Sequence, residues 1–446
     1  MHMELPEKVK SIIKTIEAAG YEAYAVGGCV RDSILGRTPD DWDITTSAKP
    51  MQVKELFRRT IDTGIKHGTV TVMLEKEGFE VTTYRVDGEY EDSRHPKHVT
   101  FTAELEEDLK RRDFTINAMA YNDRSGLIDL FGGMEDVKRR LIRCVGNPTE
   151  RFGEDALRMM RAVRFSAQLG YSIEEETENA IKDMSANLKN ISAERIQTEL
   201  VKLLTSPHPD AFRICYETGI TAVILPEFDR CMEAEQKNPH HCYTVGEHIL
   251  QSLNGVGNEK ALRLAMLFHD IGKPLTETTD EKGISHFYGH AEAGEEITRK
   301  VMHRLKFDND TLYKVTKLVL YHDYEVMPSA KSVRRAIHKT GEDIFPCLFD
   351  IKRADISAQS DYKREDKLNR LEQIEKIYRE VMAARQCVSL KTLAVTGRDL
   401  IDDGMKPGPE LGEALAGLLE LVLENPEENT KEKLLSHARR MTSKQE

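Results

Sequence analysis

The sequence predicts an α+β fold in which a mixed α/β head domain is followed by an extended all-α remainder. Residues 1–150 alternate short helical segments with strand-like segments that are rich in Val, Thr and Tyr. After about residue 150 the strand signals almost vanish, and apolar residues recur at helical spacing. The prolines that interrupt residues 205–240 indicate a boundary region there; they are Pro207, Pro209, Pro226 and Pro239.

The head is expected to begin with a helix whose apolar face carries Ile12, Ile13 and Ile16 and which ends near Gly20. Strands are expected at residues 21–26, 41–46, 68–74 and 79–85, with a short helix at 30–35. Helical periodicity then predicts helices at residues 151–169, 173–184, 193–204, 245–253, 259–269, 291–305, 311–321 and 366–384. We divide the chain into four parts: a head at 1–145, a neck at 146–225, a histidine-rich domain at 226–385 and a helical tail at 386–446.

Composition is typical of a soluble globular protein. Hydrophobic residues make up 39% of the 446 residues and charged residues 31%, and no apolar run reaches the ~18–20 residues that a membrane span needs. The seven cysteines are scattered and odd in number, which argues against a disulfide framework and favours the reducing cytoplasm. The net charge of −12 lowers the expectation of a general nucleic-acid binder without excluding local basic patches. The oligomeric state stays open.

Two aspartates follow a glycine pair near the N-terminus. On a strand, Asp41 and Asp43 would point the same way and form a pair of hard oxygen ligands for Mg²⁺. The glycine pair that ends at Gly28 would let the backbone approach a phosphate, and Arg31 could meet that phosphate with a planar fork of donors. Two metal ions about 3.5–4 Å apart are the usual solution for nucleotidyl transfer. The alternative interpretation of these residues is a solvated turn without a catalytic role.

A second pattern begins at Arg151, where one helix would carry Glu154, Asp155, Arg158 and Arg161 on one face. The bland interpretation is a helix surface with salt bridges. Cytosine and adenine, however, each present an amino donor beside a ring-nitrogen acceptor. Asp155 could accept from the amino group and Arg158 could donate to the ring nitrogen, which would select CTP and ATP against UTP and GTP.

A third pattern combines four histidines with two aspartates in the middle of the chain. Mixed nitrogen and oxygen ligands of this kind suit a divalent transition metal, and the last two histidines would complete a second site. With 15 histidines in the chain, the alternative is a set of unrelated structural side chains. The candidates are His248, His269, Asp270, His290, His322 and Asp355.

These motifs, together with residues 80–96 and 107–120, resemble the class II tRNA nucleotidyltransferases. These are the CCA-adding enzymes of the polymerase-β-like nucleotidyltransferase family, which also includes bacterial poly(A) polymerases. The resemblance implies a polymerase-β-like head that uses CTP, ATP and tRNA. It implies that Asp41 and Asp43 are the catalytic metal ligands, with Glu80 a weaker candidate for a further acidic group. It also implies that Arg112 contacts the triphosphate and Asp113 the ribose.

In the same family the neck motif is a protein template for the incoming base. Carried over to this chain, Asp155 and Arg158 read the base, whereas Arg161 and Arg164 support it or hold phosphate. Residues 192–200 resemble the helix that supports this neck, and residues 386–446 resemble the tail that docks tRNA. Two basic clusters, around Arg334 and Arg439, are the available candidates for RNA contacts.

The histidine pattern resembles an HD-type domain of the HDIG variety, which hydrolyses phosphomonoesters or cyclic phosphates. Several functions therefore remain open. The first expectation is template-independent addition of C, C and A to tRNA. The alternatives are an A-adding enzyme, a poly(A) polymerase, a phosphohydrolase whose head domain is inactive, and a non-catalytic RNA-binding protein. The loop at residues 87–96 is complete, which favours an enzyme able to add A.

Overall fold

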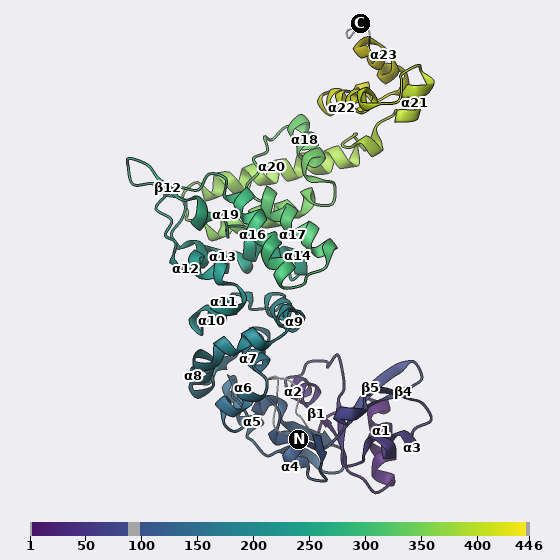
Figure 1. Cartoon of the computed structure of the whole chain (residues 1–446), viewed down its shortest axis with the longest axis vertical. Helices are drawn as coiled ribbons and strands as arrows, with labels where there is room; N and C mark the ends of the chain where they lie inside the picture. Colours follow the sequence, from purple (N-terminus) through teal and green to yellow (C-terminus); the bar gives the residue numbers. More distant parts are fainter. Residues whose placement is uncertain (1, 88–98, 443–446) are drawn as a thin grey trace. The chain divides into compact units, whose positions relative to one another are not determined.

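The computed structural model describes residues 2–87 and 99–442. The chain forms two compact units, Met1–Asp229 and Arg230–Glu446, and the division falls within helix α12 (Pro226–Glu233). Figure 1 colours the chain from its N-terminus to its C-terminus and labels the elements. Each unit is described separately.

The first unit is built on a mixed sheet. Among the described residues this sheet has seven strands in the order β3-β4-β5-β2-β1-β8-β9. All neighbouring strands are antiparallel except β2 and β5. The strands are β1 (Ala23–Val26), β2 (Ile44–Thr46), β3 (Thr60–Gly64), β4 (Thr69–Leu74), β5 (Glu77–Thr83), β8 (Met119–Asn122) and β9 (Gly126–Asp129). A separate short pair consists of β6 (Arg85–Asp87) and β7 (Val99–Phe101).

Short helices connect and cover these strands. The first helix, α1, buries the predicted apolar face of Ile12, Ile13 and Ile16. The central strand β1 is buried along its whole length, so the residues that follow it are held by the core of the head. The helices of this part are α1 (Glu7–Ala18), α2 (Gly28–Ile34), α3 (Pro50–Leu56), α4 (Leu105–Lys110) and α5 (Gly133–Arg139).

Helices continue the first unit after the sheet. The expected single helix at 151–169 is wrong, because the chain breaks at Asp155, whose φ of −144° and ψ of 103° are extended. Asp155 Oδ1 accepts a hydrogen bond from the Leu157 amide at 3.1 Å and thereby satisfies a free donor at the start of the second helix. The helices are α6 (Pro148–Glu154), α7 (Leu157–Leu169), α8 (Glu175–Met184), α9 (Ala193–Leu204), α10 (Phe212–Glu217) and α11 (Thr221–Ile224).

The second unit is mainly helical. One two-stranded hairpin, β12 (Thr278–Thr279) with β13 (Ser285–His286), interrupts the helices. The helices are α13 (Val245–Leu253), α14 (Lys260–Phe268), α15 (Lys273–Thr276), α16 (His290–Arg304), α17 (Asn309–Tyr321), α18 (Ala330–Thr340), α19 (Phe345–Ala358), α20 (Arg364–Ala383), α21 (Gly397–Asp402), α22 (Pro409–Glu424) and α23 (Lys431–Thr442).

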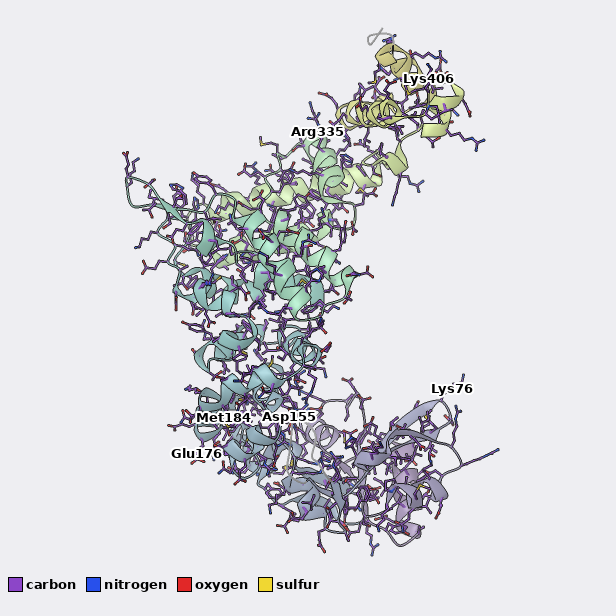
Figure 2. All side chains as sticks on the ribbon, viewed as in Figure 1. Lys76, Asp155, Glu176, Met184, Arg335 and Lys406 are labelled. Atoms are coloured by element: carbon purple, nitrogen blue, oxygen red, sulfur yellow. The ribbon has the colours of Figure 1, made fainter. Side chains whose placement is uncertain are left out.

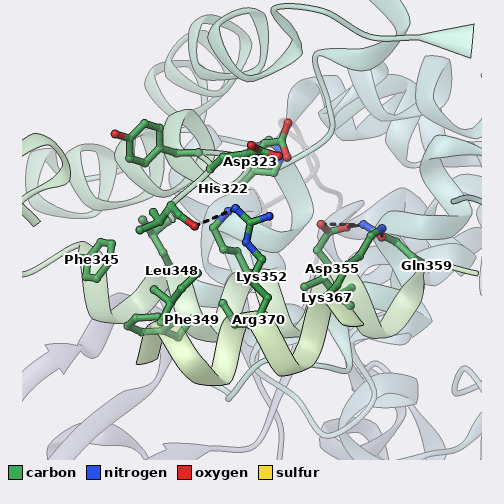
Figure 3. A pocket seen from close by; sticks show the side chains of 16 residues that line it. His322, Asp323, Phe345, Leu348, Phe349, Lys352, Asp355, Gln359, Lys367 and Arg370 are labelled. Carbon is green, nitrogen blue, oxygen red and sulfur yellow. Dashed lines mark hydrogen bonds between the residues drawn. The ribbon is translucent and has the colours of Figure 1, made fainter. Parts of the chain in front are cut away.

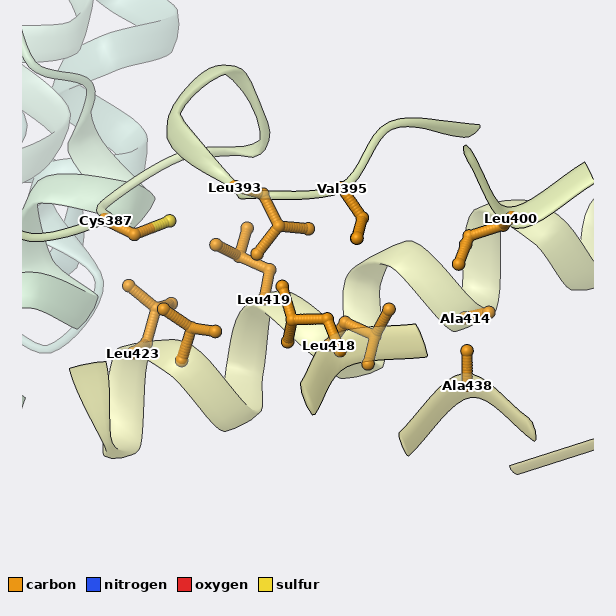
Figure 4. Close-up of a cluster of buried hydrophobic side chains, with 11 residues drawn as sticks. Cys387, Leu393, Val395, Leu400, Ala414, Leu418, Leu419, Leu423 and Ala438 are labelled. Atoms are coloured by element: carbon orange, nitrogen blue, oxygen red, sulfur yellow. The ribbon is translucent and has the colours of Figure 1, made fainter. Parts of the chain in front are cut away.

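The end of the second unit has its own apolar core, drawn in Figure 4, in which α22 contributes Leu418, Leu419 and Leu423. Arg334 on α18 donates to the carbonyl oxygens of Leu423 at 2.8 Å and Glu424 at 3.1 Å. These are carbonyl groups at the end of α22 that lack a partner within the helix, so Arg334 stabilises that terminus.

The predicted α+β fold class is therefore confirmed. One predicted strand is wrong at its start, because β2 begins at Ile44 and leaves Asp41 and Asp43 just before it. No helix within residues 2–87 and 99–442 combines the length and apolar character that crossing a membrane requires. The seven cysteines are free thiols. The finer division into four domains stays a prediction.

Candidate active site and histidine cluster

The connection from β1 to α2 forms one edge of the candidate active site. Gly27 has φ +85°, and a Cβ atom there would lie 3.0 Å from Arg112 Nη1, so glycine is required for both the backbone conformation and the close approach. Gly28 begins α2. The buried side chain of Arg31 donates to Asn117 Oδ1 at 2.6 Å and to both carboxylate oxygens of Asp32 at 2.9 Å.

Asp41, Asp43 and Glu80 form an exposed acidic group beside this connection. Strands β2 and β5 are parallel with Ile44 opposite Val81, which places Asp43 and Glu80 opposite each other one residue earlier. Burial raises the pKa of the Asp43 carboxyl and Asp41 raises it further, although Arg112 opposes the shift. Burial also raises the pKa of Glu80, and both aspartates add to that effect.

Besides burial, the charges of neighbouring carboxylates contribute to both shifts, so the carboxylates lie close enough to repel one another. No hydrogen bond or ion pair joins their carboxylates to another described residue. Hard carboxylate oxygens without partners are the donor set that Mg²⁺ prefers, so the residues fit the metal that the sequence predicts. The weaker candidate, Glu80, lies beside Asp43 in the parallel register of β2 and β5.

Arg112 and Asp113 follow α4 and differ in their surroundings. Arg112 Nη2 lies 3.5 Å from Asp108 Oδ2. Asp113 is buried, and its Oδ2 accepts hydrogen bonds from Arg161 Nε at 2.9 Å and Nη2 at 2.6 Å. Burial by itself would raise the pKa of the Asp113 carboxyl, but the Arg161 guanidinium holds it well below its usual range. Asp113 therefore stays ionised and fixes Arg161.

The predicted base-reading residues lie at the break between α6 and α7, where Figure 2 labels Asp155. Arg195 on α9 grips Asp155 with two hydrogen bonds, from Nη2 to Oδ2 at 2.6 Å and from Nη1 to Oδ1 at 3.3 Å. Arg158 pairs with Glu154 at 2.5 Å and donates to the Arg111 carbonyl oxygen at 2.9 Å. Arg195 of α9 and Glu154 of α6 thus hold the two side chains in place.

Arg164 has a different environment from the other arginines of α7. It is buried, its Nε lies 2.5 Å from Glu199 Oε2 on α9, and its Cζ lies 3.8 Å from the centre of the Phe165 ring. This arrangement favours the predicted supporting role for Arg164 over contact with phosphate.

Sequence reasoning gave no role to Arg195 or Asn117, although both stand in segments that it singled out. Asn117 bridges Arg31 and Asp113, since its Nδ2 also donates to Asp113 Oδ1 at 3.2 Å. A basic residue in the helix at 192–200 was the available signal for Arg195. The loop of residues 88–98, which includes Asp92, Arg94 and Pro96 of the predicted flexible loop, lies outside the described residues.

The second unit brings all six predicted histidine-cluster residues together from five parts of the chain. His248 on α13 lies 2.8 Å from Asp355 on α19, joining His248 Nε2 and Asp355 Oδ1. His269 Nε2 lies 3.3 Å from both His248 Nε2 and Asp270 Oδ2. On the other side, His290 Nε2 and His322 Nε2 are 3.2 Å apart and lie 3.7 Å and 3.6 Å from Asp270 Oδ1.

Asp270 thus belongs to two groups of possible metal ligands. One group is His248, His269 and Asp270, and the other is Asp270, His290 and His322; the ligand atoms within each group all lie within 4.8 Å of one another. The other ring nitrogens of His269, His290 and His322 contact backbone carbonyl oxygens at 2.6–2.8 Å, which orients Nε2 toward the centre. The cluster fits one or two transition-metal ions.

Charge and packing explain this arrangement. Burial would raise the pKa of the Asp270 carboxyl, but Lys273, 2.7 Å away, and His269 keep the pKa far below its usual range. Burial lowers the pKa of His290, which favours the neutral imidazole that binds metal. Gly272 is also required, because a Cβ atom there would lie 2.2 Å from the His290 carbonyl oxygen.

The basic cluster around Arg334 is largely engaged within the second unit. Lys331 forms an ion pair with Glu424, and Arg335 lies 3.1 Å from Glu420. These pairs join α18 to α22, so this cluster is weaker evidence for an RNA surface than the sequence suggests.

Family models match three segments of the chain. "Poly A polymerase head domain" matches residues 23–143, and "Probable RNA and SrmB- binding site of polymerase A" matches residues 170–232. The third, "tRNA nucleotidyltransferase domain 2 putative", matches residues 275–438. The first of these matches contains the acidic group, and the third contains His290, His322 and Asp355.

Known proteins resemble the chain over nearly its whole length. The CCA-adding enzyme of Lactobacillus helveticus is 40% identical over 429 residues, which are 95% of this chain and 94% of that protein. The CCA-adding enzyme of Lacticaseibacillus paracasei is 38% identical over 97% of this chain and 95% of that protein. A crystal structure of the Bacillus stearothermophilus CCA-adding enzyme in complex with CTP aligns with a TM-score of 0.75 at 32% identity and covers 99% of both chains.

Proposed function

The chain belongs to the family of CCA-adding enzymes, and we propose that it adds C, C and A to the 3′ end of tRNA from CTP and ATP in the cytoplasm. The resemblance covers both units of the chain, and the first unit carries an acidic group and a base-reading pair. The observation that carries the proposal concerns the Asp155 carboxylate. Hydrogen bonds hold it in place, and it can still accept one more.

That capacity follows from a count of hydrogen bonds. Asp155 accepts two from Arg195 and one from the Leu157 amide. An ionised carboxylate offers about four acceptor positions, so one remains for the exocyclic amino group of cytosine or adenine. Uracil and guanine present a carbonyl oxygen at that position, which would face the carboxylate unfavourably. Arg158 lies in the first turn of α7, three residues after Asp155, and would donate to the ring nitrogen.

The reaction itself falls to the acidic group. Asp41 and Asp43, with Glu80 beside them, would hold Mg²⁺. Bound there, Mg²⁺ would lower the pKa of the RNA 3′-hydroxyl and neutralise charge on the departing pyrophosphate. Arg112 lies close enough to Asp43 to lower its pKa, and Arg31 follows the glycine pair on α2; both would supply positive charge for the triphosphate. Positioning and electrostatic stabilisation would account for most of the rate acceleration.

A gel assay tests this proposal. Purified protein is incubated with Mg²⁺ and CTP, ATP or both, on tRNA ending at the discriminator base, on tRNA ending in CC and on an unrelated oligonucleotide. We expect stepwise addition of C, C and A that stops on the first tRNA. A single A added only to the CC-ended tRNA would indicate an A-adding enzyme, and long A tails on every RNA would indicate a poly(A) polymerase.

Two variants then test the assigned residues. Asp43→Ala should abolish addition without unfolding the head, and retained activity would refute the role of the acidic group. Arg158→Ala should reduce the preference for CTP and ATP over UTP, and unchanged selectivity would refute the base-reading role.

A second activity is favoured by the histidine cluster. We infer that the second unit contains an HD-type centre that binds divalent transition metal and hydrolyses phosphate esters. The support is the convergence of six candidate ligand side chains in one cluster, three of them oriented by backbone carbonyl groups. A bound metal ion would supply an activated water for hydrolysis.

Metal analysis tests this second activity without relying on turnover. The protein is loaded with Mn²⁺, Ni²⁺ or Zn²⁺, dialysed, and its metal content measured. We expect bound metal in the wild type and in the control His303→Gln, which alters an exposed histidine of α16, and loss of metal in Asp270→Asn. A wild-type protein that retains no metal would refute the proposed centre.

A further inference from the structure

A cavity of about 210 Å³ lies directly beside the histidine cluster. It is lined by residues of α19 and α20 and by residues 322–326, and two of its lining residues, His322 and Asp355, are themselves candidate metal ligands. Figure 3 shows this cavity from close by. A ligand in the cavity would therefore reach the cluster from one side.

The two ends of the cavity differ in chemistry. Phe345, Leu348 and Phe349 lie toward one end of the view in Figure 3, and Asp355 and Gln359 lie toward the other. One end can therefore bury an apolar ring, while the other end faces the metal ligands. The cavity is small. Its volume of 210 Å³ corresponds to about seven water molecules at ~30 Å³ each, and it is below the ~300 Å³ of sites that bind larger ligands.

Cationic side chains stand between these ends. Arg370 Nη2 donates to the Val326 carbonyl oxygen at 3.2 Å. Lys367 Nζ lies 2.5 Å from Gln359 Oε1, and Gln359 Nε2 in turn donates to both oxygens of Asp355 at 3.1 Å. Gln359 therefore couples Lys367 to a candidate metal ligand.

Lys352 differs from its two cationic neighbours. Across residues 2–87 and 99–442, its ammonium group forms no hydrogen bond or ion pair. Burial lowers the pKa of Lys352, although Asp323, Asp355 and Glu325 act in the opposite direction. Lys352 lines the cavity, and a phosphate that lies against its ammonium group would give it a direct, charge-assisted partner.

We propose that this cavity binds a phosphomonoester that carries one small ring. The phosphate lies at the histidine cluster and accepts hydrogen bonds from Lys352, and the ring lies against Phe345 and Phe349. The proposal rests on the HD-type activity proposed above, and it adds the single ring of the ligand and the cavity residues that would bind it. The size of the cavity favours a single-ring ester over a polynucleotide.

The test uses phenylphosphonate, which has the phosphate geometry and a ring but no ester bond to hydrolyse. Methylphosphonate is the matched probe without a ring. Binding of each to the metal-loaded full chain is measured by calorimetry. We expect phenylphosphonate to bind at least about tenfold more tightly than methylphosphonate, because the ring is buried at the apolar end.

Variants assign the binding to this cavity. Lys352→Met should weaken both probes about tenfold or more, since a charge-assisted hydrogen bond is lost. Phe349→Ala should remove the preference for phenylphosphonate while leaving methylphosphonate binding unchanged. Lys376→Met, which alters an exposed lysine of α20, should leave both affinities unchanged. Thermal unfolding and metal content of each variant establish that it is folded and loaded.

The outcomes separate this proposal from the one on which it rests. Equal affinities for the two probes, or equal affinities of wild type and a folded Lys352→Met variant, would overturn the cavity proposal even if the protein binds metal. If the wild type binds no metal, the HD-type activity fails. In that case the ring preference and its dependence on Lys352 still decide whether the cavity binds this class of ligand.

Discussion

Arg195 provides a sharp test of how the proposed base-reading pair, Asp155 and Arg158, is positioned. It touches neither of the predicted metal ligands, and its guanidinium grips Asp155 from α9 through contacts of 2.6 Å and 3.3 Å. Replacing Arg195 by Ala removes both hydrogen bonds and leaves the Asp155 carboxylate with one hydrogen bond among the described residues, from the Leu157 amide. The carboxylate would then have to be ordered by the incoming nucleotide itself.

The magnitude follows from the contact that is lost. The Arg195 and Asp155 side chains are 22% and 18% exposed, so solvent screens the pair only in part. A hydrogen bond to a charged group contributes about 1.5–3 kcal/mol. If that energy is lost from the transition state, kcat/KM for CTP and ATP should fall about 10- to 150-fold, because about 1.36 kcal/mol corresponds to a factor of ten.

The assay is single-nucleotide addition with CTP, ATP and UTP as competing substrates. Addition from UTP gains nothing from the carboxylate, so it should fall less, and selectivity should shrink. Arg195→Lys keeps a charge but not the two-pronged geometry, and it should give an intermediate value. Lys202→Ala, at an exposed position of α9, is the matched control. Wild-type selectivity in a folded Arg195→Ala protein would refute the positioning role.

Two further predictions concern the stability of the head, for which the fluorescence of Trp42, the single tryptophan, is the probe. Burial would raise the pKa of Asp108, but the charges of Arg111 and Arg112 and hydrogen bonds from Arg111 and Thr45 together outweigh burial, and the folded pKa is lowered. This carboxylate therefore stabilises the fold above its unfolded pKa and ceases to do so as pH falls through the folded pKa. In urea unfolding, Asp108→Asn should therefore be less stable than wild type by about 1–3 kcal/mol at pH 7. The difference in unfolding free energy should narrow toward pH 3, and a difference that stays constant with pH would contradict this account. Gly27→Ala forces a Cβ atom to within 3.0 Å of Arg112 at positive φ, so we expect a loss of about 1–2 kcal/mol and a raised KM for CTP, and unchanged unfolding would show that the backbone adapts.

The sequence indicated which residues form the acidic group better than it indicated their backbone conformation. A strand was expected to run through Asp41 and Asp43, but β2 begins only at Ile44. Aspartate is depleted in strands, and the Asp43 carbonyl oxygen still accepts a hydrogen bond from the Val26 amide at 3.0 Å. The neighbour relation with Glu80 depends on the register of β2 and β5, which no local pattern contains.

The broken helix at Asp155 could have been predicted. The apolar residues keep helical spacing through residues 151–169. This spacing alone does not reveal an interruption of the helix at a single residue. Gly153 followed by Asp155, directly before an apolar segment, is however a signal for a new helix start. The cavity beside the histidine cluster could not be predicted in the same way, because Lys352 and Arg370 meet only when α19 and α20 pack together.

The two parts of the nucleotidyltransferase site differ in how their charges are balanced, and this difference assigns them different tasks. Asp155, Arg158 and Arg161 are already paired with protein groups, so they keep one geometry before any nucleotide binds. Within the part of the chain that the structure describes, Asp41 and Asp43 have no such partners and repel each other, which favours binding of a cation. A change in the paired group should therefore alter which base is chosen, whereas a change in the acidic group should alter whether any base is added. Selectivity and rate should separate in variants of the two groups, and variants of both groups that lowered rate and selectivity in parallel would contradict this division.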